Sequence, residues 1–334
     1  MGNQLHTVAG EMVSAGRGIL AADESISTMS TRLEKAGVAP DEEHRRAYRE
    51  MLVTTPGLAQ AISGVILADE TLRARLRDGR SFPEAVSAAG LLPGIKVDTG
   101  AKPLAGARGE TVTEGLDGLR ERFSEYAALG ARFAKWRAVI KIGPGLPTDN
   151  ALHANAHGLA RYAALSQEAG LVPIVEPEVL MDGDHDMDRC AAVTATTLTR
   201  VFEELDIASV DLEGIVLKPN MVTAGSGASQ QASVEEVAQR TVEVLRSVVP
   251  SSVPGVAFLS GGQPPEVATA HLAAMQLLGR QPWELTFSFG RALVDPALKA
   301  WHGDPDLVAA GQAALHERSA ANGAARLVAA GSPG

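Results

Sequence analysis

Eight short apolar segments recur along this 334-residue chain, and stretches with helix signals lie between them. Most of the segments are too short for a helix, and several are bounded by Gly or Pro, which is typical of buried strands. They begin roughly 30 to 45 residues apart, which leaves room for a crossover helix between parallel strands. The segments are Arg17–Ala21, Ile62–Ala68, Gly94–Val97, Phe133–Ile140, Leu171–Val175, Gly214–Leu217, Val256–Ser260 and Leu285–Ser288.

Helix signals separate these strand candidates. Ser233 and Glu236 form a capping box before a periodic apolar stretch that runs to Val249. Strands that alternate with helices predict an α/β fold, a closed (β/α)8 TIM barrel, with a doubly wound open sheet as the structural alternative. Further helices are predicted from Pro40 and Asp41 to about Thr54, from Asp149 through Ala151–Ala169 to Gly170, and from Pro264 and Pro265 through Val267–Leu278 to Gly279.

No long low-complexity linker divides the chain, so we predict a single barrel domain over residues 1–334. Helices before the first strand and after the last strand are expected as additions at the barrel ends. The Ala- and Gly-rich residues from about 309 to 334 predict a C-terminal helix that gives way to a flexible tail.

Composition excludes several classes of function. Apolar residues make up 45% of the chain, enough for a substantial core. A formal net charge of −10 argues against nucleic acid as a partner, although a local basic cluster could still bind a small phosphorylated ligand. No apolar run reaches the roughly 20 residues of a membrane helix. A single cysteine, Cys190, and an N-terminus without a secretory pattern favour the cytoplasm.

Polar residues gather where the predicted strands end, which is where (β/α)8 enzymes carry their chemistry. Any one of them alone has an ordinary structural explanation, but charges of both signs that converge have a desolvation cost and are usually kept for function. In strand order they are Asp23, Glu24 and Ser25; Lys96 and Asp98; Lys135 and Arg137; Glu176 and Glu178; Lys218; Ser260, Gly261 and Gly262; and Ser288, Phe289, Gly290 and Arg291.

Cations in this set suit an anionic substrate at one mouth of an acidic protein. Burial and neighbouring cations would lower the pKa of one lysine, and a lysine must be neutral to attack a carbonyl. Carboxylates beside it could carry the protons. Glycine-bearing strand ends such as Ser260–Gly262 and Gly290–Arg291 are where barrels commonly bind phosphate, although the sequence signal alone is weak.

Two other polar clusters raise the possibility of a metal site. The segment Asp182–Asp186 lacks the spacing of a calcium loop and is better interpreted as a loop that caps a helix. His153 and His157 are four residues apart, but no carboxylate of the zinc-protease pattern accompanies them, so a plain helix face is favoured. We therefore expect no metal.

Long segments from about Gly18 to about Trp301 closely resemble class I fructose-bisphosphate aldolases of the animal and plant type. Their number and order make a chance resemblance untenable. The segments are GILAADES (18–25), GVIL and DETL (64–72), GIKVD (94–98), ETVTEGLDGLRER (110–122), FAKWR (133–137), VPIVEPEVLMDGDHD (172–186), LKPNMVT (217–223), FLSGGQ (258–263) and LTFSFGRAL (285–293).

The resemblance implies a role for each matching residue. It implies that Lys218 forms the Schiff base with a phosphorylated ketose, that Glu176 is the acid/base residue, that Asp23 helps to deprotonate the C4 hydroxyl, and that Lys135 orients the intermediate. It also implies a cytoplasmic homotetramer with no cofactor. The implied substrate-binding residues are Ser260, Gly261, Gly262, Ser288, Gly290 and Arg291 at one phosphate, Ser25, Thr28, Arg32, Lys96 and Arg137 at the other, and Glu178.

Some positions depart from the family pattern. Many animal members end in a tyrosine implicated in proton exchange, whereas this sequence ends in Ser332–Gly334. Phe289 occupies a position often filled by tyrosine, and Thr99 replaces a common lysine. Three other functions stay open: a transaldolase-like Schiff-base enzyme, a metal-dependent aldolase, and a catalytically inactive relative that serves as a binding protein. The sequence does not distinguish fructose 1,6-bisphosphate from fructose 1-phosphate or sedoheptulose bisphosphate as substrate.

Overall fold

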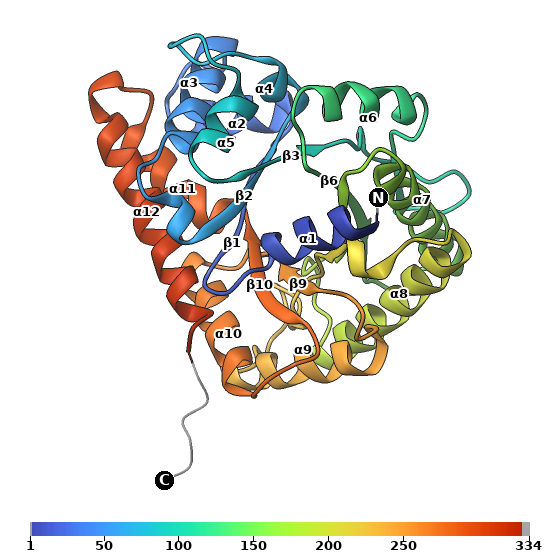
Figure 1. Cartoon of the computed structure of the whole chain (residues 1–334). Coiled ribbons are helices and arrows are strands. Elements are labelled where there is room, and N and C mark those ends of the chain that lie inside the picture. The colour runs from blue at the N-terminus through green and yellow to red at the C-terminus, as the bar shows by residue number, and fades with distance from the viewer. Residues whose placement is uncertain (1, 329–334) are drawn as a thin grey trace.

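The strands of the computed structural model, which describes residues 2–328, close into one parallel barrel (Figure 1). The prediction of a (β/α)8 barrel is confirmed, and the open sheet is excluded. Around the barrel the order is β1, β10, β9, β8, β7, β6, β3, β2. The barrel strands are β1 Gly18–Ala22, β2 Ile62–Leu67, β3 Leu92–Lys96, β6 Phe133–Ile140, β7 Val172–Val179, β8 Val216–Leu217, β9 Gly255–Phe258 and β10 Glu284–Phe289.

Helices cover the outside of the barrel and occur at the predicted places. Ser233 and Glu236 form the predicted capping box at the start of α9, and Asp41 caps α3. Thr148 rather than Asp149 caps α7. The helices are α1 Gly2–Met12, α2 Ile26–Lys35, α3 Glu42–Val53, α4 Asp69–Arg73, α5 Phe82–Ala88, α6 Leu119–Ala128, α7 Asp149–Glu168, α8 Met187–Ile207, α9 Val234–Val248, α10 Pro265–Leu277, α11 Arg291–Trp301 and α12 Val308–Ala325, with 3₁₀ turns at Leu58–Gln60, Leu212–Gly214 and Pro305–Leu307.

Strands such as β1 and β2 are buried along their whole length because one face meets the helices and the other fills the barrel interior. Glycines make room for an aromatic side chain of the barrel interior, Phe133. A β-carbon at Gly94 would overlap the ring of Phe133, and one at Gly64 would lie 2.9 Å from the same ring. Neighbouring strands thus supply the space that Phe133 fills, which fits the close packing of a barrel core.

Helix α1 lies across the amino-terminal end of the barrel, in front of the strands in Figure 1. Its buried residues, such as Val8 and Met12, share one core with interior residues such as Ile66 and Val216. This helix therefore closes the end opposite the predicted chemistry, as expected of an addition at a barrel end.

Helix α12 was expected to lie at an end of the barrel. It packs instead along the outer side of the barrel, against α11, α10 and α3. Arg326, just after it, is buried and donates hydrogen bonds to Leu285 O (2.8 Å) and Val13 O (3.1 Å) near the amino-terminal ends of β10 and β1. The predicted flexible tail, residues 329–334, lies outside the described residues. Within residues 2–328, no helix has both the length and the apolar character of a membrane span.

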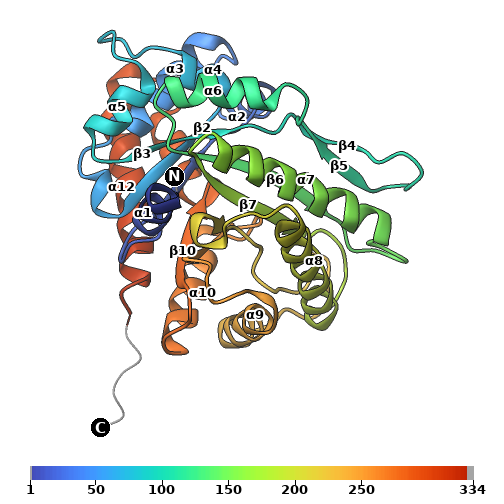
Figure 2. The same ribbon diagram turned by 45° about the vertical axis from the view of Figure 1, so that its right-hand side comes forward.

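An antiparallel ribbon that we did not predict interrupts the rhythm of strands and helices between β3 and β6. It consists of β4 Gly100–Pro103 and β5 Thr111–Glu114 and stands beside the barrel at the carboxyl end of β3 (Figure 2). Its strands are short, and Thr113 is their one buried residue, so the sequence carries little hydrophobic signal for them.

Candidate active site

Four predicted catalytic side chains meet: Lys135 and Glu176 within β6 and β7, and Asp23 and Lys218 directly after β1 and β8. Lys135 Nζ lies 2.7 Å from Asp23 Oδ2 and 3.1 Å from Glu176 Oε2. Lys218 Nζ lies 3.4 Å from Glu176 Oε1. All four side chains are buried, with exposed fractions between 3% and 8%. The barrel therefore concentrates two cations and two carboxylates in one water-poor volume.

The two lysines of this cluster have pKa values shifted in opposite directions. Burial lowers the pKa of Lys218, and the cation of Lys135 lowers it further, against the opposing effect of Glu176. Burial also opposes the charge of Lys135, but Asp23 and Glu176 outweigh it and raise the pKa of Lys135. Lys218 is thus the lysine that loses its proton more readily, and a neutral amine is a nucleophile for carbonyl carbon.

The carboxylates of the cluster are held in the ionised form. Burial alone would raise the pKa of Asp23, but Lys135 and Lys218 together lower it to about 2. The pKa of Glu176 is also lowered, because Lys135, Lys218 and Arg137 outweigh its burial. Both groups can therefore accept protons at neutral pH, and Glu176 is placed to exchange one with Lys218.

A second charged cluster lies next to the first, on β3, β6 and β7. Lys96 Nζ lies 2.8 Å from Asp98 Oδ1, and Arg137 Nε pairs with Glu178 Oε2. The backbone N–H of Arg137 donates to Asp98 Oδ2 at 3.2 Å, which joins the two pairs. Lys96 pairs with Lys135 in the β3–β6 register, so this cluster borders the four catalytic candidates.

The glycine-bearing ends of β9 and β10 approach each other. Gly261 and Gly262 have positive φ angles of 57° and 87°, and they form a tight turn after Ser260. A β-carbon at Gly262 would lie 3.4 Å from Arg291 Nη2, which places the guanidinium beside this turn. Arg291 is exposed at the first turn of α11, whose free N–H groups favour an anion.

Two further residues of the predicted phosphate site lie on β10 and at its end. Ser288 is 1% exposed, and its Oγ has no hydrogen-bond partner among residues 2–328. Gly290 caps α11. The predicted phosphate residues after β9 and β10 are therefore brought together.

The residues predicted for the other phosphate fall into two groups. Ser25 caps α2 and accepts a hydrogen bond from the backbone N–H of Thr28 at 3.2 Å. Arg32 forms ion pairs with Glu24 and, at 2.5 Å, with Asp295 of α11. Within residues 2–328, no hydrogen bond or ion pair joins these three residues to Lys96 or Arg137, which belong to the cluster described above.

The segments weighed as metal sites have other partners. Asp186 caps α8 through a hydrogen bond from Arg189 N at 2.7 Å, as predicted. His153 and His157 are not a plain helix face, because their Nδ1 atoms lie 3.1 Å and 3.0 Å from the two carboxylate oxygens of Glu204. In the part of the chain that the structure describes, no group of three or more His, Cys, Asp and Glu side chains is arranged to hold a metal ion.

Two residues near the site received no role from the family resemblance. Asp98 was among the polar residues at the predicted strand ends, and the structure pairs it with Lys96. Arg49 lies on the apolar face of α3 beside Tyr48 and Leu52, and an arginine on such a face is a signal of a buried polar contact. It donates hydrogen bonds to the backbone on both sides of Asp23.

Comparisons with known proteins agree with this geometry. Residues 4–330 match the family model described as "Fructose-bisphosphate aldolase class-I". A relative from Xanthomonas campestris, named a probable fructose-bisphosphate aldolase class 1, is 55% identical over 97% of each chain. The cytosolic fructose-bisphosphate aldolase 4 of Arabidopsis thaliana is 52% identical over 93% of this chain and 80% of its own.

A solved structure extends the likeness to three dimensions. Fructose-bisphosphate aldolase from Plasmodium falciparum, in complex with TRAP and a small-molecule inhibitor, superposes with a TM-score of 0.97. It is 44% identical, and the match covers 99% of this chain and 96% of that one. The family model and the relatives exclude the transaldolase-like and metal-dependent alternatives. The chain belongs to the class I fructose-bisphosphate aldolase family.

Proposed function

We propose that this chain reversibly cleaves fructose 1,6-bisphosphate to dihydroxyacetone phosphate and glyceraldehyde 3-phosphate through an imine on Lys218. The observation that carries the proposal is the pairing of two buried lysines with opposite pKa shifts beside the same carboxylate. Lys218 is suited to be the neutral nucleophile, and Lys135 keeps its positive charge. Family membership supports the reaction class.

The first half of the reaction forms the imine. Lys218 Nζ adds to the C2 carbonyl carbon, and Glu176, 3.4 Å away, takes the proton that the amine loses. Glu176 passes this proton to the C2 oxygen, which becomes the hydroxyl of the carbinolamine. A second proton, taken up from solvent through Glu176, then protonates that hydroxyl, which leaves as water and gives the iminium. Because its pKa is lowered, Glu176 is ionised in the free protein and can accept the first proton.

The second half breaks the bond between C3 and C4. Asp23 accepts the proton of the C4 hydroxyl, the electrons of the bond pass into the iminium, and the aldehyde is released. The resulting enamine is protonated at C3 and then hydrolysed to free Lys218. Lys135, charged and 2.7 Å from Asp23, holds that carboxylate and stabilises negative charge nearby.

The phosphates would hold the sugar in register with these groups. We assign one to Ser260, Gly261, Gly262, Ser288, Gly290 and Arg291, a placement supported by the approach of Arg291 to the glycine turn. We assign the other to the side of Lys96 and Arg137, with Ser25 and Thr28 at the start of α2 and Arg32 in its last turn. Glu178, which pairs with Arg137, is a further proposed substrate-binding residue. Lys96 and Arg137 offer cations there, although each already has a carboxylate partner.

We also propose a cytoplasmic homotetramer of single-domain subunits. The cytosolic relatives from Arabidopsis thaliana support the location. The tetramer rests on the family resemblance alone, and sedimentation equilibrium of the purified protein would test it by the mass of the assembly.

Cleavage of fructose 1,6-bisphosphate by the purified protein, measured with a coupled dehydrogenase, tests the proposed activity. We expect turnover by the wild-type protein and by Lys299→Ala, whose lysine is exposed on α11, and none by Lys218→Ala. Normal turnover of Lys218→Ala would refute the assignment of the nucleophile. A folded wild-type protein without turnover would support the inactive, binding-only relative.

A further inference from the structure

The carboxylate of Asp23 stands just beyond the hydrogen-bonded part of β1. The last paired residue of that strand is Ala22, which is opposite Leu67 of β2. Residues 23–25 have no regular secondary structure. The sheet therefore does not fix the direction in which the Asp23 side chain leaves the backbone, although its Oδ2 lies only 2.7 Å from Lys135.

Arg49 supplies hydrogen bonds where the sheet ends. One Nη donates to the carbonyl oxygen of Ala22, and the other donates to the carbonyl oxygen of Glu24 at 3.2 Å. These two carbonyls flank Asp23 in the chain. The planar guanidinium can span both acceptors at once, which a single ammonium group cannot do as rigidly.

An ion pair offsets part of the cost of burying this arginine, whose Nε has no hydrogen-bond partner among residues 2–328. Arg49 is 3% exposed, and its Nη2 lies 2.9 Å from Glu24 Oε2. Glu24 also pairs with Arg32, which in turn pairs with Asp295 of α11. A buried charge with such partners stays in place, whereas one without them would be expelled or strongly destabilising.

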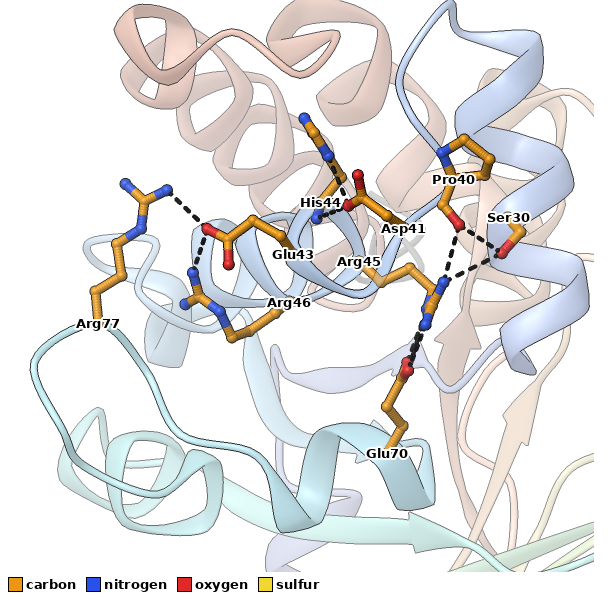
Figure 3. A network of polar contacts seen from close by, with 9 residues as sticks. All are labelled: Ser30, Pro40, Asp41, Glu43, His44, Arg45, Arg46, Glu70 and Arg77. Atoms are coloured by element: carbon orange, nitrogen blue, oxygen red, sulfur yellow. Dashed lines mark hydrogen bonds and ion pairs between the residues drawn. The ribbon is translucent and has the colours of Figure 1, made fainter.

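Helix α3, which carries Arg49, is itself held at several points (Figure 3). Arg45 donates to both carboxylate oxygens of Glu70 on α4, at 2.6 Å and 2.9 Å, and to Pro40 O at 3.0 Å. On the neighbouring residue, Tyr48 Oη donates to Val294 O of α11 at 3.3 Å. The helix is thus a fixed support from which Arg49 reaches the end of β1.

We propose that Arg49 is a positioning residue for the reaction: it holds the backbone on both sides of Asp23 so that this carboxylate faces Lys135 and the C4 hydroxyl of the substrate. The inference rests on the role proposed above for Asp23. Arg49 makes no contact with the reacting atoms; it acts through Asp23 alone.

The test compares Arg49→Met and Arg49→Lys with the wild-type protein. We expect kcat of Arg49→Met to fall roughly 10- to 100-fold, because a displacement of about 1 Å can cost about 100-fold. KM should change little, and borohydride should still trap dihydroxyacetone phosphate on Lys218, since β8 is untouched. Arg49→Lys should recover part of kcat, because an ammonium can still reach one carbonyl.

The background of Asp23→Ala makes the test specific. If Arg49 acts through Asp23, the further loss from Arg49→Met in that background should be less than about threefold. Arg326→Met is the matched control, because Arg326 is also buried and also donates to backbone carbonyls, but at the amino-terminal ends of the strands. It should lower the melting temperature while leaving kcat of the folded protein unchanged.

Each outcome supports or overturns the inference. An unchanged kcat in both Arg49 variants would overturn the role of Arg49 but not the proposed function. So would an Arg49→Met loss of kcat that is as large in the Asp23→Ala background as in the wild-type protein. Absence of a trapped adduct in the wild-type protein would instead overturn the proposed function, and the inference with it. If Arg49→Met does not fold, Arg49→Lys in both backgrounds decides the question.

Discussion

Lys218 and Lys135 are both buried at the mouth of one barrel, yet their neighbours give them different chemistry. Lys218 faces one carboxylate and another cation, whereas Lys135 lies between Asp23 and Glu176. The effect of burial therefore dominates the pKa of Lys218 and lowers it, whereas the two neighbouring carboxylates dominate the pKa of Lys135 and raise it. Crowding alone predicted a lowered pKa for one lysine without saying which. The family resemblance pointed to Lys218, and the contacts give the physical reason.

This difference leads to a prediction for pH. Because the pKa of Lys218 is lowered, its neutral form and hence imine formation should appear at a lower pH than for a solvated lysine of pKa about 10.4. Lys135→Met removes a cation that lowers that pKa and leaves Glu176 and Asp23, which raise it. The midpoint of the pH dependence of imine formation should therefore move to higher pH in Lys135→Met.

Rapid quenching into borohydride after mixing with dihydroxyacetone phosphate would give the rate of imine formation at each pH. Arg280→Met, a change of an exposed cation outside the site, serves as the control and should leave the midpoint in place. A midpoint that moved to lower pH in Lys135→Met would contradict the electrostatic explanation.

Arg291 is the exposed cation beside the glycine turn, so its loss should weaken substrate binding. A hydrogen bond to a charged group contributes about 1.5–3 kcal/mol, so Arg291→Ala should raise KM roughly 10- to 100-fold. The initial rates of cleavage over a range of substrate concentrations measure this, and Arg280→Ala provides the comparison. An unchanged KM would mean that the phosphate binds elsewhere.

At the scale of elements, the eight strand positions could be predicted because the barrel strands are largely buried and their segments are mostly apolar, as in β1 and β2. The caps of α3 and α9 were predictable for a local reason, since Asp41, Ser233 and Glu236 bond to backbone within three residues. The ribbon of β4 and β5 was missed because its pairing involves few apolar residues.

Candidate-site residues on strands were easier to predict than those on helices. A charge within an apolar run, such as Lys135, or directly after one, such as Lys218, stands out in the sequence. The division of Arg32 from Lys96 and Arg137 could not be predicted, because it depends on Asp295, more than two hundred residues away in the chain. Long-range ion pairs of this kind leave no local pattern.

Packing between strands gives a prediction at this scale. Gly94→Ala places a methyl group against Phe133, so we expect a destabilisation of about 1–3 kcal/mol in urea unfolding. Phe133→Leu in the same chain should recover part of that loss, since the smaller side chain gives way. Gly158→Ala is the control: no atom lies within 4 Å of the added methyl group, and alanine favours the helix.

Equal losses at Gly94 and Gly158 would contradict this packing explanation. So would a Gly94→Ala protein as stable as the wild type. The first result would mean that the loss at Gly94 does not come from contact with Phe133, and the second that the barrel interior can move away from the added methyl group.

At the scale of the whole molecule, the two ends of the barrel have separate tasks. Helix α1 and Arg326 close the amino-terminal end through apolar burial and hydrogen bonds to carbonyls. The opposite end holds the charged clusters, where residues from β1, β3, β6, β7 and β8 meet. Stability and chemistry are thus separated along the barrel axis, as in other (β/α)8 enzymes. The extent of a single domain over residues 1–334 stays a prediction.

The most direct test of the central claim is to trap the enzyme with dihydroxyacetone phosphate and borohydride and to map the adduct by peptide mass spectrometry. We expect one reduced adduct, on Lys218, and none in Lys218→Ala. An adduct on Lys135 instead, or no adduct on folded protein that still cleaves the substrate, would contradict the claim that Lys218 is the nucleophile.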